Sequence, residues 1–201
     1  MALNFANNNS LSSITSLPAS ISGGGLNLIS TQTASGSSSL SFTSGIDSTY
    51  KEYVFKFINI HPASDGVNFS FQASTNGGSS YGVTATTTTF VANHKEDGSD
   101  SNFYYNTGID LAQSTNYAII NDYYVNDNDA SGSGTLHLFE PSSDTFVKHF
   151  IADFNNLYKP TYTNRTLSAG YFNSTSVIDA VDFKFSSGNI DSGTIIMYGV
   201  S

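Results

Sequence analysis

The sequence predicts an all-β fold, an antiparallel β-sandwich of the jelly-roll type, and three observations lead to this prediction. Only 11% of the 201 residues are charged, and the chain is instead rich in Ser, Thr and Asn, with 12 Tyr and 15 Phe. Ser, Thr, Tyr and Phe fit the pleated surface of a sheet, whereas Gly, Asn and Asp fit turns. Apolar residues also alternate with a period of two, as in Tyr53–Phe57 and Val67–Phe71. Turn-forming clusters separate such segments along the chain, which favours many short strands.

The individual strands follow from this alternation, or from runs of β-branched residues, taken in order along the chain. We expect strands at Leu26–Ser30, Leu40–Phe42, Tyr53–Ile60, Val67–Phe71, Tyr81–Val91, Tyr117–Val125, Gly134–Phe139, Phe146–Ala152, Ser168–Phe172, Val177–Phe185 and Gly193–Val200. Clusters rich in Gly, Ser, Asn and Asp predict turns at 74–80, 126–134, 140–144 and 186–193. No helix of ordinary length is expected.

The segment from Tyr53 to Phe71 gives the clearest hairpin signal. Ser64-Asp65-Gly66 is a typical turn sequence between its two alternating runs. The alternation also predicts which aromatic side chains face the core. These are Tyr53, Phe55, Phe57, Phe69, Phe71, Phe183 and Phe185.

Charge and composition exclude several classes of function. The formal net charge is −9, with seven Lys and Arg in total, and a surface of that sign repels the phosphate backbone of nucleic acids. The chain has no Cys, which excludes disulfides and thiolate metal sites. No apolar stretch approaches the length of a membrane span, and the first residues lack the features of a secretory signal. We therefore expect neither nucleic-acid binding nor membrane insertion.

Residues 1–25 differ from the rest of the chain because their apolar residues are too sparse for a core strand. The sequence leaves two interpretations open, a disordered tail or an arm that docks on another subunit. We predict the arm, joined through Gly23–Gly25 to a sandwich domain at 26–201. Its attachment residues would be Leu3, Phe5, Leu11, Ile14, Leu17 and Ile21.

Two loops carry groups that could bind a metal ion. His94–Asp100 combines a histidine with carboxylates, and such a group can also act as acid and base. Asp127–Gly132 resembles the first half of a calcium loop, but Leu138 stands where the bidentate Glu is required. The prediction is that both are plain surface loops and that the chain holds no metal or cofactor.

The remaining histidines are expected to have structural positions. His137 and His149 alternate with apolar residues inside strands, so their side chains should lie on an outward or interface face. His61 precedes Pro62 at the end of a strand and is interpreted as a turn residue.

Motifs for enzymatic chemistry are not found in the sequence. It contains no Gly-x-Ser-x-Gly, no phosphate-binding Gly-x-x-x-x-Gly-Lys loop and no His-Glu-x-x-His. Paired carboxylates that meet only in space stay open, but the lack of Trp argues against a sugar-cleaving or sugar-binding cleft. We expect a protein that is not an enzyme.

Several segments together resemble a family of virion structural proteins from tailed bacteriophages of marine bacteria. The segments that carry the resemblance are Met1–Ala19, Ser44–Pro62, Ala73–Tyr81, Gly134–Phe139, Ala169–Ser176 and Ser186–Gly199. The resemblance covers nearly the whole chain. It implies a place on the outer surface of the head or tail of a virion, and it brings no catalytic residue.

Two functional hypotheses follow from the resemblance. The first is a capsid decoration or fibre-like subunit that is anchored by its N-terminal arm. Such a subunit would be a homo-oligomer, for instance a trimer, in contact with other virion proteins. The second is a tail-fibre or adhesin-like module that binds host surface glycan. Copy number and location on the particle would separate the two.

Overall fold

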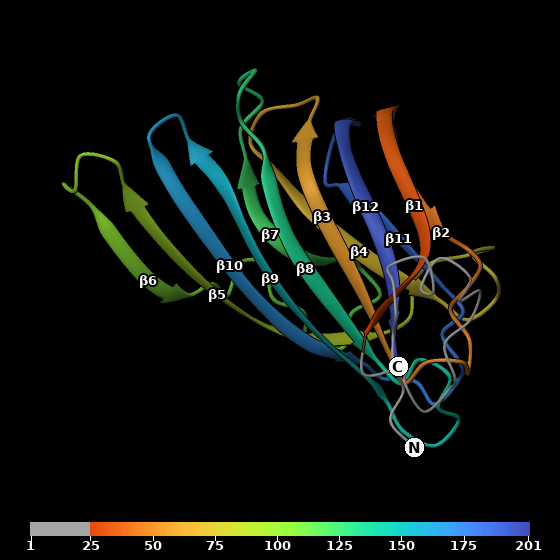
Figure 1. Cartoon of the computed structure of the whole chain (residues 1–201). Helices are drawn as coiled ribbons and strands as arrows, with labels where there is room; N and C mark the ends of the chain where they lie inside the picture. Colours follow the sequence, from red (N-terminus) through yellow and green to blue (C-terminus); the bar gives the residue numbers. More distant parts are fainter. Residues whose placement is uncertain (1–24) are drawn as a thin grey trace, which may run out of the picture.

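The computed structural model describes residues 25–201, and these form two antiparallel sheets packed face to face (Figure 1). The prediction of an all-β, antiparallel fold is confirmed, and no helix occurs in this part of the chain. The strands are β1 (Leu26–Ser37), β2 (Leu40–Phe42), β3 (Glu52–Pro62), β4 (Val67–Ser74), β5 (Ala85–Lys95), β6 (Ser101–Tyr105), β7 (Ala118–Tyr124), β8 (Gly132–Phe139), β9 (Lys148–Lys159), β10 (Tyr162–Phe172), β11 (Ala180–Phe185) and β12 (Ile190–Val200).

The two sheets differ in width, and this difference positions the site described below. The larger sheet has the order β1-β12-β3-β8-β9-β10-β5-β6, and the smaller has the order β2-β11-β4-β7. In Figure 1 the smaller sheet lies behind the larger one, and β5 and β6 project beyond it on the left. We call β5, β6 and residues 162–169 of β10 the extension, and the two packed sheets the sandwich.

An aromatic cluster fills the sandwich. Phe183 of β11 lies at its centre, with ring centroids 5.0 Å from Phe57, 5.3 Å from Phe55 and 5.9 Å from Phe71. The contact with Phe57 is edge-to-face, that with Phe55 is tilted and that with Phe71 is stacked, and ring contacts of these kinds add to the stabilisation from burial alone. All seven aromatic residues predicted to face the core are at most 3% exposed, so that prediction is confirmed.

The predicted hairpin between β3 and β4 is wrong. β3 pairs with β12 and β8 in the larger sheet, whereas β4 pairs with β11 and β7 in the smaller one. The turn at Ser64–Gly66 therefore carries the chain from one sheet to the other. Phe57 and Phe69 meet across the interior with ring centroids 5.8 Å apart. A turn sequence specifies a reversal of the chain, and the packing of both apolar faces decides whether the two strands also pair.

Strand lengths also differ from the sequence prediction, mainly in and beside the extension. β9 continues to Lys159 and β10 begins at Tyr162, so a long hairpin replaces two short predicted strands. β6 was not expected, because Ser101–Tyr105 is two polar residues followed by three aromatic ones and shows no alternation. Its pairing with β5 is continuous from Ser101 to Tyr105.

Candidate functional site

The outer face of the extension and of the adjacent strand β9 carries apolar side chains that water reaches. Phe103 is 70% exposed and Ile151 51%, and the others lie between 36% and 41%. We call this group the outer patch. Its members are Phe90, Phe103, Tyr105, Ile151 and Leu167.

Strand register places these residues together on one face. Leu167 of β10 is opposite Phe90 of β5, which is in turn opposite Tyr105 of β6. Ile151 of β9 is opposite Ala169, two residues from Leu167 on β10. Because side chains alternate between the faces of a strand, these positions all point away from the smaller sheet. The outer patch thus crosses four adjacent strands.

Packing between rings gives the outer patch a defined shape. Phe90 stacks on Phe103 with an interplanar angle of 7° and centroids 5.9 Å apart. Phe90 also contacts Tyr105 edge-on at 5.3 Å. The Tyr105 hydroxyl donates a hydrogen bond of 2.5 Å to Asp110 Oδ2, and this bond raises the pKa of the phenol. The rings are held before any partner arrives, which lowers the entropic cost of binding.

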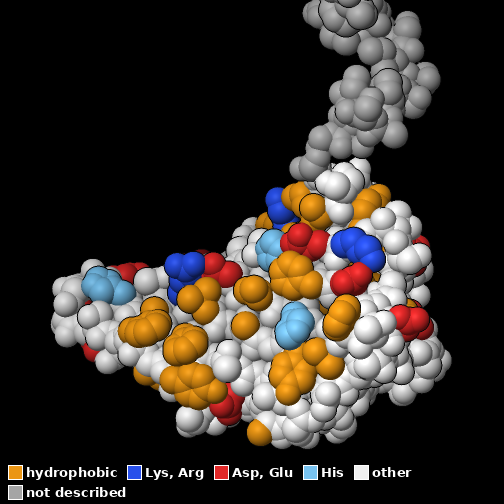
Figure 2. Space-filling model, turned by 90° about the horizontal axis from the view of Figure 1, so that it is seen from below, with side chains coloured by type: hydrophobic (Ala, Val, Ile, Leu, Met, Phe, Trp, Pro, Cys, Tyr) orange, Lys and Arg blue, Asp and Glu red, His pale blue; other side chains and the backbone are white. Residues whose placement is uncertain are grey.

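Charged groups lie at the margin of the outer patch. Arg165 forms a two-pronged ion pair with Asp153, with Nε–Oδ1 at 2.9 Å and a second N–O contact of 2.6 Å. Asp153 is opposite Leu167 in the register. In Figure 2, groups of orange hydrophobic side chains lie on the face seen from below, with histidine and charged side chains among them. An apolar centre with charges at its margin is typical of protein-binding surfaces.

A shallow groove of about 420 Å³ continues the apolar surface towards β8 and β9. Phe139, His149, Ile151 and Tyr171 line it, and the ring centroids of His149 and Tyr171 are 6.0 Å apart. Gly170 lies in its wall, where a Cβ atom would come within 2.5 Å of the Thr86 carbonyl oxygen. A side chain at position 170 would therefore push β5 and β10 apart.

Polar residues at one end of the groove form a short chain of hydrogen bonds. Gln113 Nε2 donates to the Tyr171 hydroxyl at 3.3 Å, and Asn173 Nδ2 donates to Gln113 Oε1 at 2.7 Å. His149 is exposed, and His137 of β8 contacts Glu52 through Nδ1 at 2.6 Å. Both histidines therefore lie on the outward face, as the sequence predicted.

Beneath the outer patch, the inner face is polar and buried. Asn121 of β7 donates to the Tyr124 hydroxyl at 2.7 Å and accepts a bond of 3.0 Å from the Thr166 hydroxyl. Asn156 and Asn164 are at most 2% exposed and are joined by a bond of 3.2 Å. Asn156 Nδ2 also donates to the Tyr123 carbonyl at 2.8 Å. These bonds tie β9 and β10 to the edge of the smaller sheet and hold the outer patch in place.

The charged segment His94–Asp100 comprises the end of β5 and the turn that leads to β6. Lys95 Nζ lies 2.8 Å from Asp97 Oδ2, and Ser99 N donates to Asp97 Oδ1 at 2.9 Å. The lysine contact, followed by the bonds from Ser99, lowers the pKa of Asp97 to about 2. These groups satisfy one another within the turn and do not converge on a ligand.

The calcium-like segment Asp127–Gly132 forms the loop between β7 and β8. The Asp127 carbonyl accepts a bond from Ala130 N at 2.8 Å and contacts His61 Nε2 at 3.1 Å. His61 lies in β3, 3.5 Å from Asp191, so it is placed by its strand and not by a turn. Throughout residues 25–201, no three His, Asp or Glu side chains come together in a group that could hold a metal ion.

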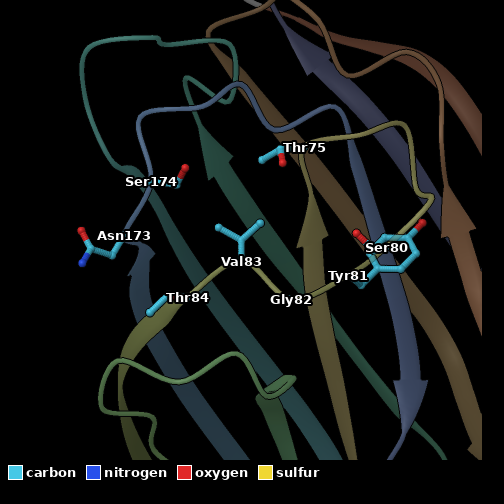
Figure 3. Close-up of a pocket in the computed structure, with 8 residues that line it drawn as sticks. All are labelled: Thr75, Ser80, Tyr81, Gly82, Val83, Thr84, Asn173 and Ser174. Carbon is cyan, nitrogen blue, oxygen red and sulfur yellow. The ribbon is translucent and has the colours of Figure 1, made fainter.

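A polar pocket lies at one end of the sandwich, between the segment after β4 and the segment after β10 (Figure 3). Thr75, Thr84, Asn173 and Ser174 contribute to its lining. Lys148 is buried beside it and donates from Nζ to the Ser174 carbonyl at 3.1 Å. Burial lowers the pKa of Lys148. The lysine supports the pocket wall, and the polar side chains of the lining are hydroxyls and one amide, beside Val83.

The residues predicted as an attachment site lie outside the described part of the chain. They are Leu3, Phe5, Leu11, Ile14, Leu17 and Ile21. The outer patch, by contrast, was missed by sequence reasoning. The consecutive aromatic residues Phe103-Tyr104-Tyr105 were a usable signal, because a strand must place at least one of them on each face.

Residues 25–201 contain no helix that is both long enough and apolar enough to cross a membrane. Comparison of the chain with protein-family models, curated proteins and solved structures finds no match.

Proposed function

We propose that this chain is a non-enzymatic structural subunit of a tailed-phage virion. It would be exposed on the particle surface as a capsid decoration or fibre-like subunit. The outer patch carries the assembly role, because aromatic and aliphatic side chains fixed on a sheet and exposed to water favour binding to another protein surface. The virion setting rests on the resemblance of the sequence segments described above.

The polar surface supports a place on the outside of a particle. The ion pairs Lys51–Glu140 and Arg165–Asp153 involve side chains that water reaches. Salt screens such pairs, since the Debye length falls to about 3 Å at 1 M ionic strength. A protein stabilised by an aromatic core loses little when such pairs are screened.

We infer a jelly-roll topology for the sandwich. The support for this topology is the strand order, because strands from the first and the second half of the chain alternate within each sheet. β1, β12, β3 and β8 lie side by side in one sheet, and β2, β11, β4 and β7 take the matching order in the other. The hairpin β5–β6 and the strands β9 and β10 would then be insertions that widen one sheet.

The proposed subunit contacts other copies of itself and other virion proteins. Residues 1–25 would act as the arm that anchors it to the particle. Burial of each of the six predicted attachment residues of this segment against a partner is worth roughly 1.5–3 kcal/mol. This arm and the outer patch would be separate contacts, one for anchoring and one for assembly.

Immunogold labelling tests the virion setting. An antibody raised against residues 25–201 should label purified phage particles at defined positions on the head or tail. Particles that lack label, from a lysate in which the free protein is detected, would contradict the proposal.

Truncation tests the arm. A chain without residues 1–22 should keep the melting temperature of the full chain but no longer join the particle. Normal incorporation of the truncated chain would assign anchoring to the sandwich. Failure of the truncated chain to fold would show that these residues belong to the core.

A glycan-binding module is the second candidate, and the groove beside the outer patch favours it. Tyr171 and His149 offer rings on which a sugar can stack, and Gln113 and Asn173 offer amides for its hydroxyls. A glycan array with the full chain and with Tyr171→Ala tests this role. Binding that Tyr171→Ala abolishes would support it, whereas binding unchanged by the substitution would place any glycan elsewhere.

A further inference from the structure

β6 is the last strand of the larger sheet, and its far side is open. Within residues 25–201 its only partner is β5. All five residues, Ser101–Tyr105, are exposed. None of them is charged and none is proline. Natural edge strands are normally protected by charge, proline or a bulge, and here the pairing of β5 with β6 runs without a bulge.

The hydrogen bonds at both ends of β6 show which backbone groups point outwards. Lys95 N donates to the Asp100 carbonyl, and Asn106 N donates to the Thr89 carbonyl, each at 2.9 Å. In an antiparallel pair every second residue bonds to the partner strand. Residues 100, 102, 104 and 106 therefore bond to β5. The N–H and C=O groups of Ser101, Phe103 and Tyr105 point away from the sheet.

We propose that two copies of this chain pair through β6, antiparallel and across a two-fold axis at Phe103. Phe103 is the middle one of the three residues whose backbone groups are unpaired, so a two-fold axis at this residue pairs all of these groups. Phe103 then faces Phe103 of the second copy, and Ser101 faces Tyr105 of the second copy. Each of these pairs can exchange two backbone hydrogen bonds. The surface is self-complementary, as a two-fold contact requires.

The same register joins the two outer patches. Phe103 and Tyr105 lie on the outer face with Phe90, whose ring contacts both. Pairing at Phe103 places the aromatic groups of both copies side by side on one continuous sheet. Asp100 would lie opposite Asn106 of the second copy, an amide and not a carboxylate. Two copies with a net charge of −9 each can therefore meet here without facing like charges.

The second copy fits this edge better than an unrelated strand for a physical reason. A strand from another protein would need unpaired backbone N–H and C=O groups at matching positions, and its apolar side chains would have to lie on the same face of the joined sheet. β6 itself meets both conditions. The inference rests on the assembly role proposed above and names its partner.

Sedimentation of the full chain at 1–100 µM tests the pairing. We expect a monomer–dimer equilibrium that persists in 1 M NaCl, because the contact contains no ion pair. Phe103→Lys places two ammonium groups opposite each other and should weaken the dimer at least tenfold. Leu28→Lys is the matched control, since Leu28 is 65% exposed on β1 at the other end of the sheet. It should leave the dimer unchanged.

Cysteine crosslinking tests the register, and the chain has no native cysteine to interfere. Cα atoms of a directly opposed, hydrogen-bonded pair lie about 5.5 Å apart, within the range of a disulfide. Phe103→Cys should therefore crosslink under oxidised glutathione, which accepts the two thiol hydrogens. Tyr104→Cys is the control, because its two copies would be offset by two residues on the opposite face.

Three results would overturn the pairing. They are a monomer at 100 µM, a dimer that Leu28→Lys disrupts while Phe103→Lys does not, and equal crosslinking of both cysteine variants. These readouts use purified protein without phage. If the purified protein is a monomer but the antibody labels phage particles, only the pairing is overturned. If the protein is a dimer but particles carry no label, only the virion role is overturned.

Discussion

The sandwich and the extension place their aromatic residues on opposite sides. In the sandwich, Phe183 is fully buried among other phenylalanine rings. In the extension, Phe103 is 70% exposed, while Asn164 and Thr166 of β10 are buried on the opposite face, where Thr166 bonds to Asn121 of β7. The sandwich is stabilised by burial of apolar surface and the extension by hydrogen bonds. The apolar surface of the extension is left for a partner.

The end of β7 explains why the inner side of the extension is polar. Tyr123 has a positive φ of 48°, and the pairing of β4 with β7 contains register shifts. The carbonyls of Asp122 and Tyr123 face the larger sheet there. Asn164 Nδ2 of the extension donates to the Asp122 carbonyl, and Asn156 Nδ2 of the adjacent β9 donates to both carbonyls. A buried carbonyl without a donor is costly, so apolar residues cannot replace these asparagines without loss.

Phe183→Ala should give the largest difference between the two regions. Removal of the central ring leaves a cavity and should reduce the free energy of unfolding by about 3–5 kcal/mol. Phe103→Ala should change it by less than about 0.5 kcal/mol. Urea unfolding at a concentration where the protein is monomeric measures both. Similar losses of unfolding free energy for the two variants would show that aromatic residues stabilise the sandwich and the extension to the same degree.

Asn121→Ala tests the hydrogen bonds that join the extension to β7 of the smaller sheet. It leaves the Tyr124 hydroxyl without its donor and the Thr166 hydroxyl without its acceptor, which should cost about 1–3 kcal/mol of unfolding free energy. Asn102→Ala, at an exposed position on β6, is the control and should cost less than about 0.5 kcal/mol. A neutral effect of Asn121→Ala would mean that water replaces the lost bonds.

Asp122 links the same interior to pH. Burial raises the pKa of its carboxyl, and a bond from Asn106 opposes this only partly. The folded state therefore holds the proton more tightly than the unfolded state, and stability falls as pH rises from about 4 through the folded pKa. Asp122→Asn should raise the melting temperature at pH 7 and have little effect near pH 3. An equal rise in melting temperature at both pH values would show that the effect of the substitution does not come from ionisation of Asp122.

Arg165→Gln should have the smallest effect. The guanidinium is bound to Asp153 at the exposed margin of the outer patch, and exposed ion pairs add little to stability. We expect a melting temperature within experimental error of the original chain, in low salt and in 1 M NaCl. A clear loss in low salt that disappears in high salt would show that the pair stabilises the extension.

The sequence alone determined the fold class, most strand positions in the sandwich, and its aromatic core. Phe55 and Phe69 show why, because strict alternation assigns each residue to a face before any partner is known. Tertiary structure decided which strands pair. The turn at Ser64–Gly66 is compatible with a hairpin and with a crossing between sheets, and only the burial of both phenylalanine faces selects the crossing. Tertiary structure also decided the outer patch. Leu167, Phe90 and Tyr105 are distant in the sequence and meet only through the register of three strands, which no local pattern encodes.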